Sequence, residues 1–417
     1  MTATTPTVPS RPESWKWVVC GLLLLASAIN YMDRQTLANA SVRITKEFGL
    51  NQAQYGQVEA VFGYAFAAGS LVFGWLADRT SIRWLYALVL AAWSAVGFAT
   101  SFARDYDGLL TCRMLLGFFE AGHWPCGIRT TRALLSARDR SLGNSVLQSG
   151  TSIGAIVTPL IMRGLMTSEL GSWRVAFQVV GAVGLFWLVL WFWLLKEADL
   201  RPPSASRNLA AGPEVNLWRM LFGRRMLIIF AVIACINTTW QILRAWLPKF
   251  LQEGRGYSEG EALYFNSAWF AATDVGCLGA GLLTVWLVKR NWSVHGSRVL
   301  VFALCGALCA ACVLVPLLGR GWLLLVVLLV AGAGALGVFP IYHAFTQDIS
   351  AEHQGKITGV AGVAAWIIPA QAQRLFGALA DQLGSFDRGL ALAAGLPLLA
   401  VLPLWLFWNH SNSKPSP

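Results

Sequence analysis

The sequence predicts an all-α membrane protein with twelve transmembrane helices in two six-helix bundles and both termini in the cytoplasm. Of the 417 residues, 56% are hydrophobic and 13% are charged, whereas soluble domains carry about 25% charged residues. Apolar runs of about 18 residues or more, long enough to cross a bilayer as a helix, recur along the whole chain. Short basic segments separate these runs and indicate the orientation.

Six apolar runs form the first predicted bundle, residues 16–195. A polar tail, residues 1–15, precedes them, and we expect it to be disordered. The bounds of the spans follow from apolar length alone. The six spans are Val18–Ala38, Tyr55–Ala77, Trp84–Ser101, Leu109–Ile128, Leu142–Ile161 and Val175–Leu195.

The longest polar stretch, residues 196–225, contains three prolines and six basic residues, and it indicates a cytoplasmic linker. The second predicted bundle covers residues 226–409, and residues 410–417 form a short polar tail. Its six spans are Met226–Leu247, Leu263–Val288, Val299–Leu318, Trp322–Phe345, Ile357–Leu379 and Leu390–Trp408.

The distribution of basic residues supports this topology. With both ends in the cytoplasm, the inner loops and tails hold 19 Lys and Arg residues, and the outer loops with their flanks hold 9. This is the positive-inside bias. The two halves also share a weak sequence similarity. In the first half, a Gly- and Pro-containing fifth span is followed by Gly171-Ser172-Trp173-Arg174. In the second half, Trp366-Ile367-Ile368-Pro369 is followed by Gly384-Ser385-Phe386-Asp387-Arg388. The similarity suggests two parallel halves, which is a known transporter plan.

An adjacent acid and base, Asp33 and Arg34, lie near the end of the first span. Each charge costs roughly 2.5 to 3.5 kcal/mol at the centre of a spanning helix. Consecutive helical residues point about 100° apart, so the two side chains are expected to find partners on other helices. The remaining ionisable residues at membrane depth are Glu59, Arg113, Glu120, Arg244, Asp274 and Arg374.

Arg113 and Glu120 are seven residues apart on the fourth span, so they share one helix face with a rise of about 10 Å. If they line one cavity with Asp33 and Arg34, the four formal charges cancel. An incoming carboxylate that pairs with an arginine would unbalance the site, and a proton on Asp33 or Glu120 would restore the balance. We therefore expect an organic anion to enter with one or more protons. The alternative is a salt-bridge cluster that only holds helices together.

The loop between the second and third spans reads Gly74-Trp75-Leu76-Ala77-Asp78-Arg79, with Arg83 four residues further on. A small Gly74 would let helices approach closely, and Asp78 with Arg79 and Arg83 could form a charge network that opens and closes. An ordinary helix-capping loop is the alternative. The loop resembles the loop motif of the major facilitator superfamily, with Ser81 at its second glycine and Ile82 at one of its basic positions. That resemblance implies the twelve-helix fold of the superfamily.

Four further blocks occur in order along nearly the whole chain. They are Asn30-Tyr31-Met32-Asp33-Arg34, Gly117-Phe118-Phe119-Glu120-Ala121-Gly122-His123-Trp124-Pro125, Ser149-Gly150-Thr151-Ser152-Ile153-Gly154-Ala155-Ile156 and His353-Gln354-Gly355-Lys356. Together they resemble the anion:cation symporter family, and within it the hexuronate (glucuronate or galacturonate) transporters most. His123 departs from that pattern, which has Asn there. A neutral, hydrogen-bonded His123 and a titrating one are the two alternatives.

The resemblance implies a role for each matching residue. It implies that Arg34 binds the substrate carboxylate and that Tyr31 donates a hydrogen bond to substrate nearby. It also implies that Asp33 and Glu120 carry protons, with Arg113 as the partner of Glu120.

The second half is expected to supply side chains that read hydroxyl groups and stack on a sugar face. Trp366 is the stacking candidate, although tryptophan in a membrane helix more often packs or marks the interface. Gln241, Tyr342 and Gln371 are the polar candidates. Asp274 and Arg374 are expected to have a structural role, as a pair.

Other classes of protein are disfavoured by the sequence. The net charge of +11 is spread over loops and forms no patch typical of nucleic-acid binding. The eight cysteines lie in or beside apolar runs, and although Cys309 and Cys312 have CxxC spacing, we expect packing roles and neither a metal site nor a cofactor. GxxxxGK[ST] and HExxH motifs are absent, and the single GxSxG match, Gly150–Gly154, lies within an apolar span and not at a strand-to-helix turn, which argues against a transport ATPase or an enzyme.

The sequence therefore predicts a secondary active transporter in the plasma (bacterial inner) membrane that is expected to act as a monomer. Its expected partners are a small anionic substrate, protons and the lipid bilayer. Carriers of another carboxylate, such as an aldonate, a short monocarboxylate or an aromatic acid, are the alternative, and drug efflux is a third. A membrane-embedded enzyme or a receptor is the alternative from a different class.

Overall fold

The computed structural model describes residues 12–136, 139–200, 222–349 and 354–408, and all regular structure within these ranges is helical. Most of the predicted tails and of the predicted linker lies outside them. One difference concerns the first tail, because α1 already begins at Glu13, directly after Pro12. A proline at a helix start has no amide hydrogen to leave unpaired, which suits this position.

The helices of residues 12–200 form a series of long rods joined by short turns. A glycine in the left-handed conformation, Gly49 with φ of 64°, ends the first of them and lets the chain turn sharply. The elements are α1 (Glu13–Phe48), α2 (Gln52–Arg79), α3 (Ile82–Thr100), α4 (Tyr106–Glu120), α5 (His123–Leu134), α6 (Arg140–Leu165), η1 (Leu170–Ser172), α7 (Trp173–Leu194) and η2 (Glu197–Leu200).

The helices after residue 221 include several that are interrupted by short irregular turns. The elements are α9 (Arg224–Lys249), η4 (Phe250–Gly254), α10 (Glu259–Lys289), α11 (Val294–Ala310), η5 (Ala311–Leu317), α12 (Trp322–Gly337), α13 (Phe339–Gln347), α14 (Gln354–Leu383), α15 (Asp387–Leu399) and α16 (Val401–Phe407).

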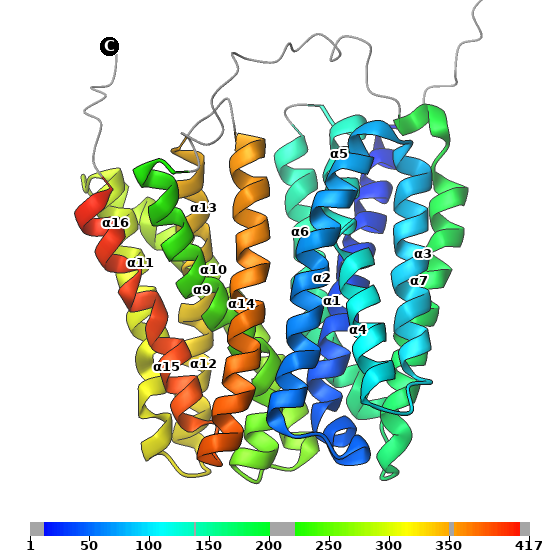
Figure 1. The fold of residues 1–417 in the computed structure, drawn as a ribbon. Coiled ribbons are helices and arrows are strands. Elements are labelled where there is room, and N and C mark those ends of the chain that lie inside the picture. Colours follow the sequence, from blue (N-terminus) through cyan, green and yellow to red (C-terminus); the bar gives the residue numbers. More distant parts are fainter. Residues whose placement is uncertain (1–11, 137–138, 201–221, 350–353, 409–417) are drawn as a thin grey trace, which may run out of the picture.

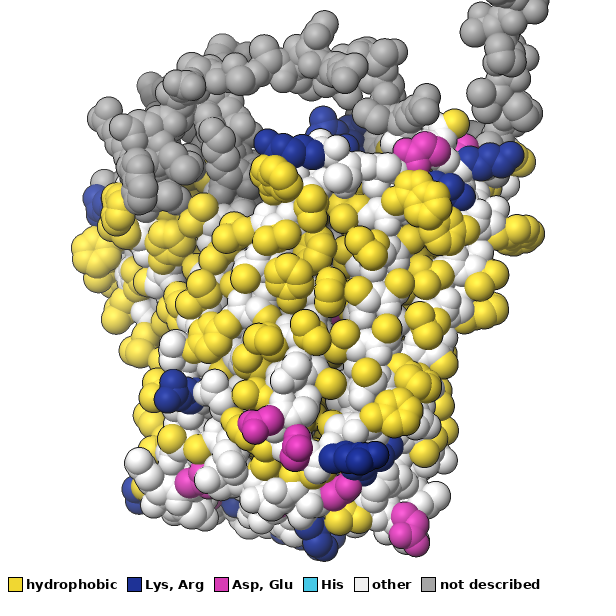
Figure 2. Space-filling model, turned by 45° about the vertical axis from the view of Figure 1, so that its right-hand side comes forward, with side chains coloured by type: hydrophobic (Ala, Val, Ile, Leu, Met, Phe, Trp, Pro, Cys, Tyr) yellow, Lys and Arg dark blue, Asp and Glu magenta, His cyan; other side chains and the backbone are white. Residues whose placement is uncertain are grey.

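Ten helical segments of the described chain are long and apolar enough to cross a membrane. Two of the predicted spans are not among them. The span predicted at Leu109–Ile128 is broken, because α4 ends at Glu120 and α5 begins at His123. The span predicted at Ile357–Leu379 lies inside α14, where Gln and Arg residues lower the hydropathy of the second half. Figure 2 shows hydrophobic side chains over the middle of one face, with charged side chains gathered toward its two ends.

The helices α1 to α7 lie on one side of the molecule and α9 to α16 on the other (Figure 1). Within the first group, α1 packs against α6, α2 against α4 and α3 against α7. Within the second, α10 and α11 pack against α12, and α9 packs against α14 and α15. The two groups meet where α2 contacts α14, α6 contacts α10 and α1 contacts α9.

The contact between α2 and α14 is tight at one end of α2 and open at the other. A Cβ atom at Gly56 would lie 2.5 Å from the carbonyl oxygen of Gln373, and one at Gly63 would lie 2.9 Å from Ala370 Cβ. Close approach of the two backbones therefore requires glycine there. Near the other end of α2, a Cβ at Gly74 would meet no atom of the described residues within 4 Å. The two helices therefore approach each other along the first part of α2.

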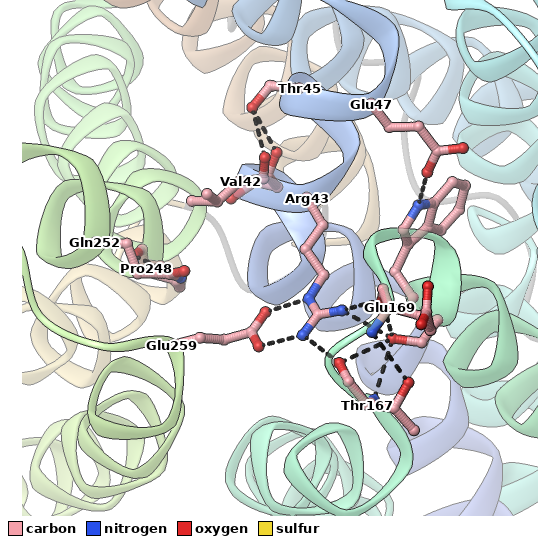
Figure 3. A network of polar contacts seen from close by, with 12 residues as sticks. Val42, Arg43, Thr45, Glu47, Thr167, Glu169, Pro248, Gln252 and Glu259 are labelled. Atoms are coloured by element: carbon pink, nitrogen blue, oxygen red, sulfur yellow. Dashed lines mark hydrogen bonds and ion pairs between the residues drawn. The ribbon is translucent and has the colours of Figure 1, made fainter.

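At this tightly packed end, polar contacts also join the two groups of helices. Arg43 of α1 donates to both carboxylate oxygens of Glu259 on α10, at 2.6 Å each (Figure 3). The fully buried Lys249 of α9 donates to Thr45 Oγ1 at 2.7 Å and to Glu253 at 2.8 Å. One apolar core cluster includes residues of both groups, among them Leu37, Tyr55, Trp246 and Phe376. The end of the molecule with the α1–α2 turn is therefore closed.

Candidate substrate and proton site

A buried ion pair joins α1 to α4 near the middle of the molecule. Arg34 Nε donates to Glu120 Oε2 at 2.6 Å, and the two side chains are 4% and 0% exposed. Arg34 Nη2 also donates to Asn30 Oδ1, one helical turn away, at 2.7 Å. Because desolvating two charges is costly, such a pair persists only when its geometry is good. The structure thus brings together two residues that the sequence analysis placed in one cavity.

The carboxyl group of Asp33 forms no ion pair with the neighbouring arginines among the described contacts. It is fully buried, and neither oxygen has a hydrogen-bond partner among the described residues. Its Oδ1 faces α3, where a Cβ added at Gly97 would lie 2.7 Å away. A buried carboxylate without partners is strongly disfavoured, whereas the neutral acid is tolerated. This environment favours the protonated form of Asp33.

Aromatic rings surround the Arg34 guanidinium on its other sides. Its Cζ lies 5.3 Å from the ring centroid of Tyr31, 5.4 Å from Phe62, 4.9 Å from Phe66 and 5.1 Å from Trp366. Cation–π attraction is strongest where water is excluded. Trp366 belongs to α14, so the two groups of helices meet at Arg34. Two predicted substrate-binding residues, Tyr31 and Trp366, thus lie beside the arginine.

The predicted pairing of Arg113 with Glu120 is not observed. Arg113 Nη2 instead lies 3.5 Å from both carboxylate oxygens of Glu59 on α2, and Glu120 is taken by Arg34. Two turns along α4 separate Arg113 from Glu120, so the same helix face reaches two different acids. The acid and the base of α4 therefore belong to two neighbouring ion pairs.

Glu59 also receives a partner from the other side of the molecule. Arg244 Nη2 of α9 donates to Glu59 Oε2 at 3.2 Å, and Tyr55 Oη lies 3.4 Å from Oε1. Arg244 Nε donates to Gln241 Oε1 at 2.8 Å. A cavity of about 10 Å³ adjoins these groups and is also lined by Phe62 and Trp366. Glu59 and Arg244 were recognised as charges at membrane depth, but their pairing across two distant helices has no signal in the sequence.

The predicted substrate-binding residues of the second half are spread over different surroundings. Gln241 is buried beside Arg244, and its backbone oxygen accepts a 2.9 Å bond from Gln373. Tyr342 is buried in an apolar cluster next to Phe339 and His343. Gln371 is exposed, on α14. Only Gln241 and Trp366 of the four predicted residues therefore lie at the cluster of charges.

The predicted loop network is largely unpaired in this conformation. Asp78, whose side chain is 76% exposed, lies 3.9 Å from Arg129. Arg79 lies over Trp75 at 4.4 Å, and Arg83 donates to the carbonyl oxygen of Leu195 at 2.8 Å. The close helix approach expected at Gly74 is absent, as described above. Among the described residues, the contacts of Asp78, Arg79 and Arg83 all stay within the first group of helices.

Other predictions for polar residues are resolved by the contacts. His123 is fully buried between Ser27 Oγ and Tyr86 Oη, each 2.9 Å away, which is the hydrogen-bonded alternative. The predicted pair of Asp274 with Arg374 does not form, because Asp274 accepts a 2.8 Å bond from Ser152 and Arg374 is exposed. The described residues contain no group of three or more His, Cys, Asp or Glu side chains that could hold a metal ion.

The long apolar helices around a central set of buried charges define a multi-pass membrane transporter. The sequence profile of the Major Facilitator Superfamily matches residues 23–372, and the chain belongs to this superfamily. The chain has the fold of a solved D-xylose–proton symporter, with a TM-score of 0.74 and 17% identity over 96% of this chain and 100% of that one.

Two named transporters are similar to this chain over nearly their whole length. The hexuronate transporter of Escherichia coli (strain K12) is 24% identical over 406 residues, which cover 94% of this chain and 93% of the relative. A probable sulfoacetate transporter of Cupriavidus necator is 27% identical over 427 residues, which cover 96% and 95%. These relatives agree with the resemblance to anion transporters seen in the sequence motifs, and with a protein that is a transporter and not an enzyme.

Proposed function

We propose that this protein is a proton-coupled symporter of an organic anion, with a sugar acid of the hexuronate class as its substrate. The observation that carries the proposal is the buried Arg34–Glu120 pair beside Asp33, a carboxyl group without a partner. The likeness to the hexuronate transporter supports the substrate class.

In this proposal Arg34 binds the substrate carboxylate, because a guanidinium matches a carboxylate with two parallel hydrogen bonds. The substrate then competes with Glu120 for Arg34, since both are acceptors. Once released, Glu120 would be a buried carboxylate without its cation, and it takes up a proton to avoid that state. Asp33 carries a second proton. Arg113 pairs with Glu59 nearby, and so acts on the charge balance without carrying a proton.

Tyr31 and Trp366 would contact the substrate beside Arg34, and Gln241 would read a hydroxyl group. The cage of rings around Arg34 supports the first two roles. Tyr342 and Gln371 would join the site only when the second group of helices moves, because neither contacts the charge cluster in this conformation. The indole ring of Trp366 could stack on the apolar face of a sugar.

The proposed mechanism is alternating access between two bundles, residues 16–195 and 226–409, joined by a cytoplasmic linker at 196–225. We propose twelve passes, counting α4 with α5 as one and α14 as another, with both ends in the cytoplasm of the plasma (inner) membrane and the chain acting as a monomer. The loops on the same side of the membrane as the two termini hold the excess of basic residues, and this supports the orientation. The closed end at the α1–α2 turn then faces outward, and the conformation is inward-facing.

In the opposite state, the loop with Gly74, Asp78, Arg79 and Arg83 would close the cytoplasmic end. No atom of the described residues lies within 4 Å of a Cβ at Gly74, which leaves room for such an approach. The sulfoacetate relative favours a second candidate substrate, a short acid that is not a sugar. Aldonates, monocarboxylates and aromatic acids complete the alternatives.

Uptake by proteoliposomes tests the proposal directly. Purified protein would be reconstituted with an imposed pH gradient, acid outside, and offered labelled glucuronate, galacturonate, galactonate, sulfoacetate and lactate. We expect uptake of at least one sugar acid that is abolished by a protonophore. Uptake that ignores the pH gradient would refute proton coupling, and uptake of sulfoacetate alone would replace the substrate class.

A further inference from the structure

Asn30 lies one helical turn before Asp33 and Arg34 on α1, and only one end of its amide group has a partner. Its Oδ1 accepts a 2.7 Å hydrogen bond from Arg34 Nη2. Its Nδ2 has no hydrogen-bond partner among the described residues, although the side chain is only 1% exposed. A buried donor without a partner costs free energy. Arg34 therefore holds the amide of Asn30 in an orientation that leaves its nitrogen unsatisfied.

Three buried polar atoms without a partner belong to neighbouring positions of α1. They are Asn30 Nδ2 and the two carboxyl oxygens of Asp33. Residues three apart on a helix share a face, with Cβ atoms about 5 to 6 Å apart. A neutral carboxyl group offers one donor and one acceptor, which complement the acceptor and the donor of an amide. An ionised carboxylate can only accept, so only the neutral form of Asp33 could satisfy both ends of the Asn30 amide.

The charged groups that act on Asp33 come from its own helix and from α4. They are Arg34, Arg113 and Glu120. All three are engaged in the ion pairs described above, and none of them bonds to Asp33. The charged residues of α3, α6 and α7 lie in the first or last turn of those helices, and His123 of α5 is bonded to Ser27 and Tyr86. Asn30, one turn away, is therefore a polar neighbour within reach of the neutral carboxyl group.

We infer that Asn30 is the positioning residue that couples substrate binding at Arg34 to the proton on Asp33. The inference rests on the proposed function, in which the substrate carboxylate binds Arg34. In the empty carrier Arg34 holds the Asn30 oxygen, and the Asp33 hydroxyl group has no acceptor. When substrate takes Arg34, the amide is released and turns, so that its Oδ1 accepts from the hydroxyl group of Asp33. Asp33 then keeps its proton during the passage across the membrane.

The direction of this coupling is the one that symport requires. Substrate on Arg34 favours the proton on Asp33, and by linkage the proton favours the substrate. After substrate has left to the inner solution, Arg34 returns to Asn30, and the proton of Asp33 follows the substrate. The proton stays on the carboxyl oxygen throughout the passage, and Asn30 only accepts a hydrogen bond from it. One hydrogen bond of this kind corresponds to roughly a two- to tenfold change in affinity.

The test counts the protons that enter with each substrate molecule. In proteoliposomes containing the full chain, a glucuronate gradient would be balanced against a pH gradient, with the membrane potential held at zero by valinomycin and potassium. We expect a ratio of two for the wild type and of one for Asn30→Leu, which replaces the amide by an apolar side chain of similar shape. Thr36→Val is the matched control, because the buried Thr36 hydroxyl bonds only to Met32 O of the same helix among the described residues, and its ratio is expected to stay at two.

A double variant separates coupling through Asp33 from a structural role of Asn30. Asp33→Asn is expected to give a ratio of one, and adding Asn30→Leu to it is expected to leave that ratio unchanged. A further fall in the double variant would show that Asn30 acts on another proton carrier, and it would overturn the inference.

The infrared spectrum of the wild type gives a measurement that does not depend on the folding of Asn30→Leu. Adding glucuronate to the purified protein is expected to shift the C=O band of a protonated carboxyl group to lower frequency, and Asp33→Asn is expected to lack this band. A ratio of two in Asn30→Leu, a ratio of one in the wild type or a band that does not move would overturn the inference and leave the proposed function in place. Wild-type uptake that ignores the pH gradient would remove both.

Discussion

Arg43 of α1 and Glu259 of α10 face each other through two parallel hydrogen bonds, 2.6 Å from Nε to Oε1 and 2.6 Å from Nη2 to Oε2. Arg43 also donates to the carbonyl oxygens of Thr167 and Glu169, at 2.7 Å and 2.6 Å, so one side chain ties three segments at the closed end (Figure 3). A two-point contact of this kind is more specific than a single ion pair.

Reversing this pair tests its contribution. Arg43→Glu and Glu259→Arg are each expected to lower the midpoint of unfolding in an SDS titration, because each replaces the ion pair by two like charges at neighbouring positions. The double variant is expected to recover part of the loss, with a coupling of roughly 1 kcal/mol, typical of a partly exposed pair. Recovery stays incomplete, because glutamate cannot donate to the carbonyl oxygens of Thr167 and Glu169. Strictly additive losses would show that the pair does not hold this end closed.

Replacing Glu120 by Gln removes a proposed proton carrier and keeps its size. We expect uptake driven by a pH gradient to fall at least tenfold, while counterflow exchange of internal for external substrate continues. Wild-type uptake is expected to rise as the external pH falls, because each proton enters with substrate, and the variant is expected to lose that dependence. Asp107→Asn, on the exposed first turn of α4, is the control. Unchanged pH-driven uptake in Glu120→Gln would remove Glu120 from the coupling mechanism.

Gly97 of α3 leaves the space that the Asp33 carboxyl group occupies. In Gly97→Ala, the added methyl group would lie 2.7 Å from Asp33 Oδ1, so the side chain must leave its present rotamer. A strained rotamer costs about 0.5 to 1.5 kcal/mol, and we expect kcat/KM to fall roughly two- to tenfold. Gly279→Ala on α10 meets no atom within 4 Å and is expected to transport normally. Equal rates in both variants would mean that the position of Asp33 does not matter.

The two ends of α2 are predicted to respond in opposite ways to the same substitution. A methyl group at Gly56 would lie 2.5 Å from Gln373 O, whereas one at Gly74 meets nothing in this conformation. Gly56→Ala is therefore expected to shift the population away from the conformation described here, and Gly74→Ala is expected to favour it. Distances between spin labels placed across each mouth would measure both shifts. A change in the same direction for both variants would contradict rocking of the two bundles.

His123 is predicted to remain neutral throughout transport. The hydroxyl hydrogen of Ser27 is used in a 3.2 Å bond to Leu23 O, so Ser27 Oγ accepts from Nε2–H, and Tyr86 donates to Nδ1. A second proton on the ring would face the donor of Tyr86. We expect His123→Gln to leave the pH profile of transport between about pH 6 and 8 unchanged, with a loss of stability of about 1 to 3 kcal/mol. Loss of an inflection in that pH range would identify His123 as a titrating group.

Much of the fold follows from the composition of single segments. Ten of the predicted spans correspond to helices that are apolar and long enough to cross a membrane, because hydrophobic length is a local property. The break between Glu120 and His123 was not predicted, since a span interrupted by Ala121 and Gly122 keeps its apolar length. At Gly122 an added Cβ would lie 2.7 Å from Val89, and this approach belongs to the packing of α3, not to the helix itself.

The sequence by itself determined which side chains carry charge at membrane depth, because an ionisable residue inside an apolar run is visible without any structure. It also placed Asp33, Arg34 and Glu120 in one region. Only the tertiary structure decided that Arg34 pairs with Glu120, that Glu59 joins Arg113 to Arg244, and which end of the molecule is closed. Periodicity fixes the face of a helix on which a residue lies, but the partner depends on how far each helix slides and turns against its neighbours. That displacement is set by side-chain packing between helices distant in the chain, as at Gly56 and Gln373.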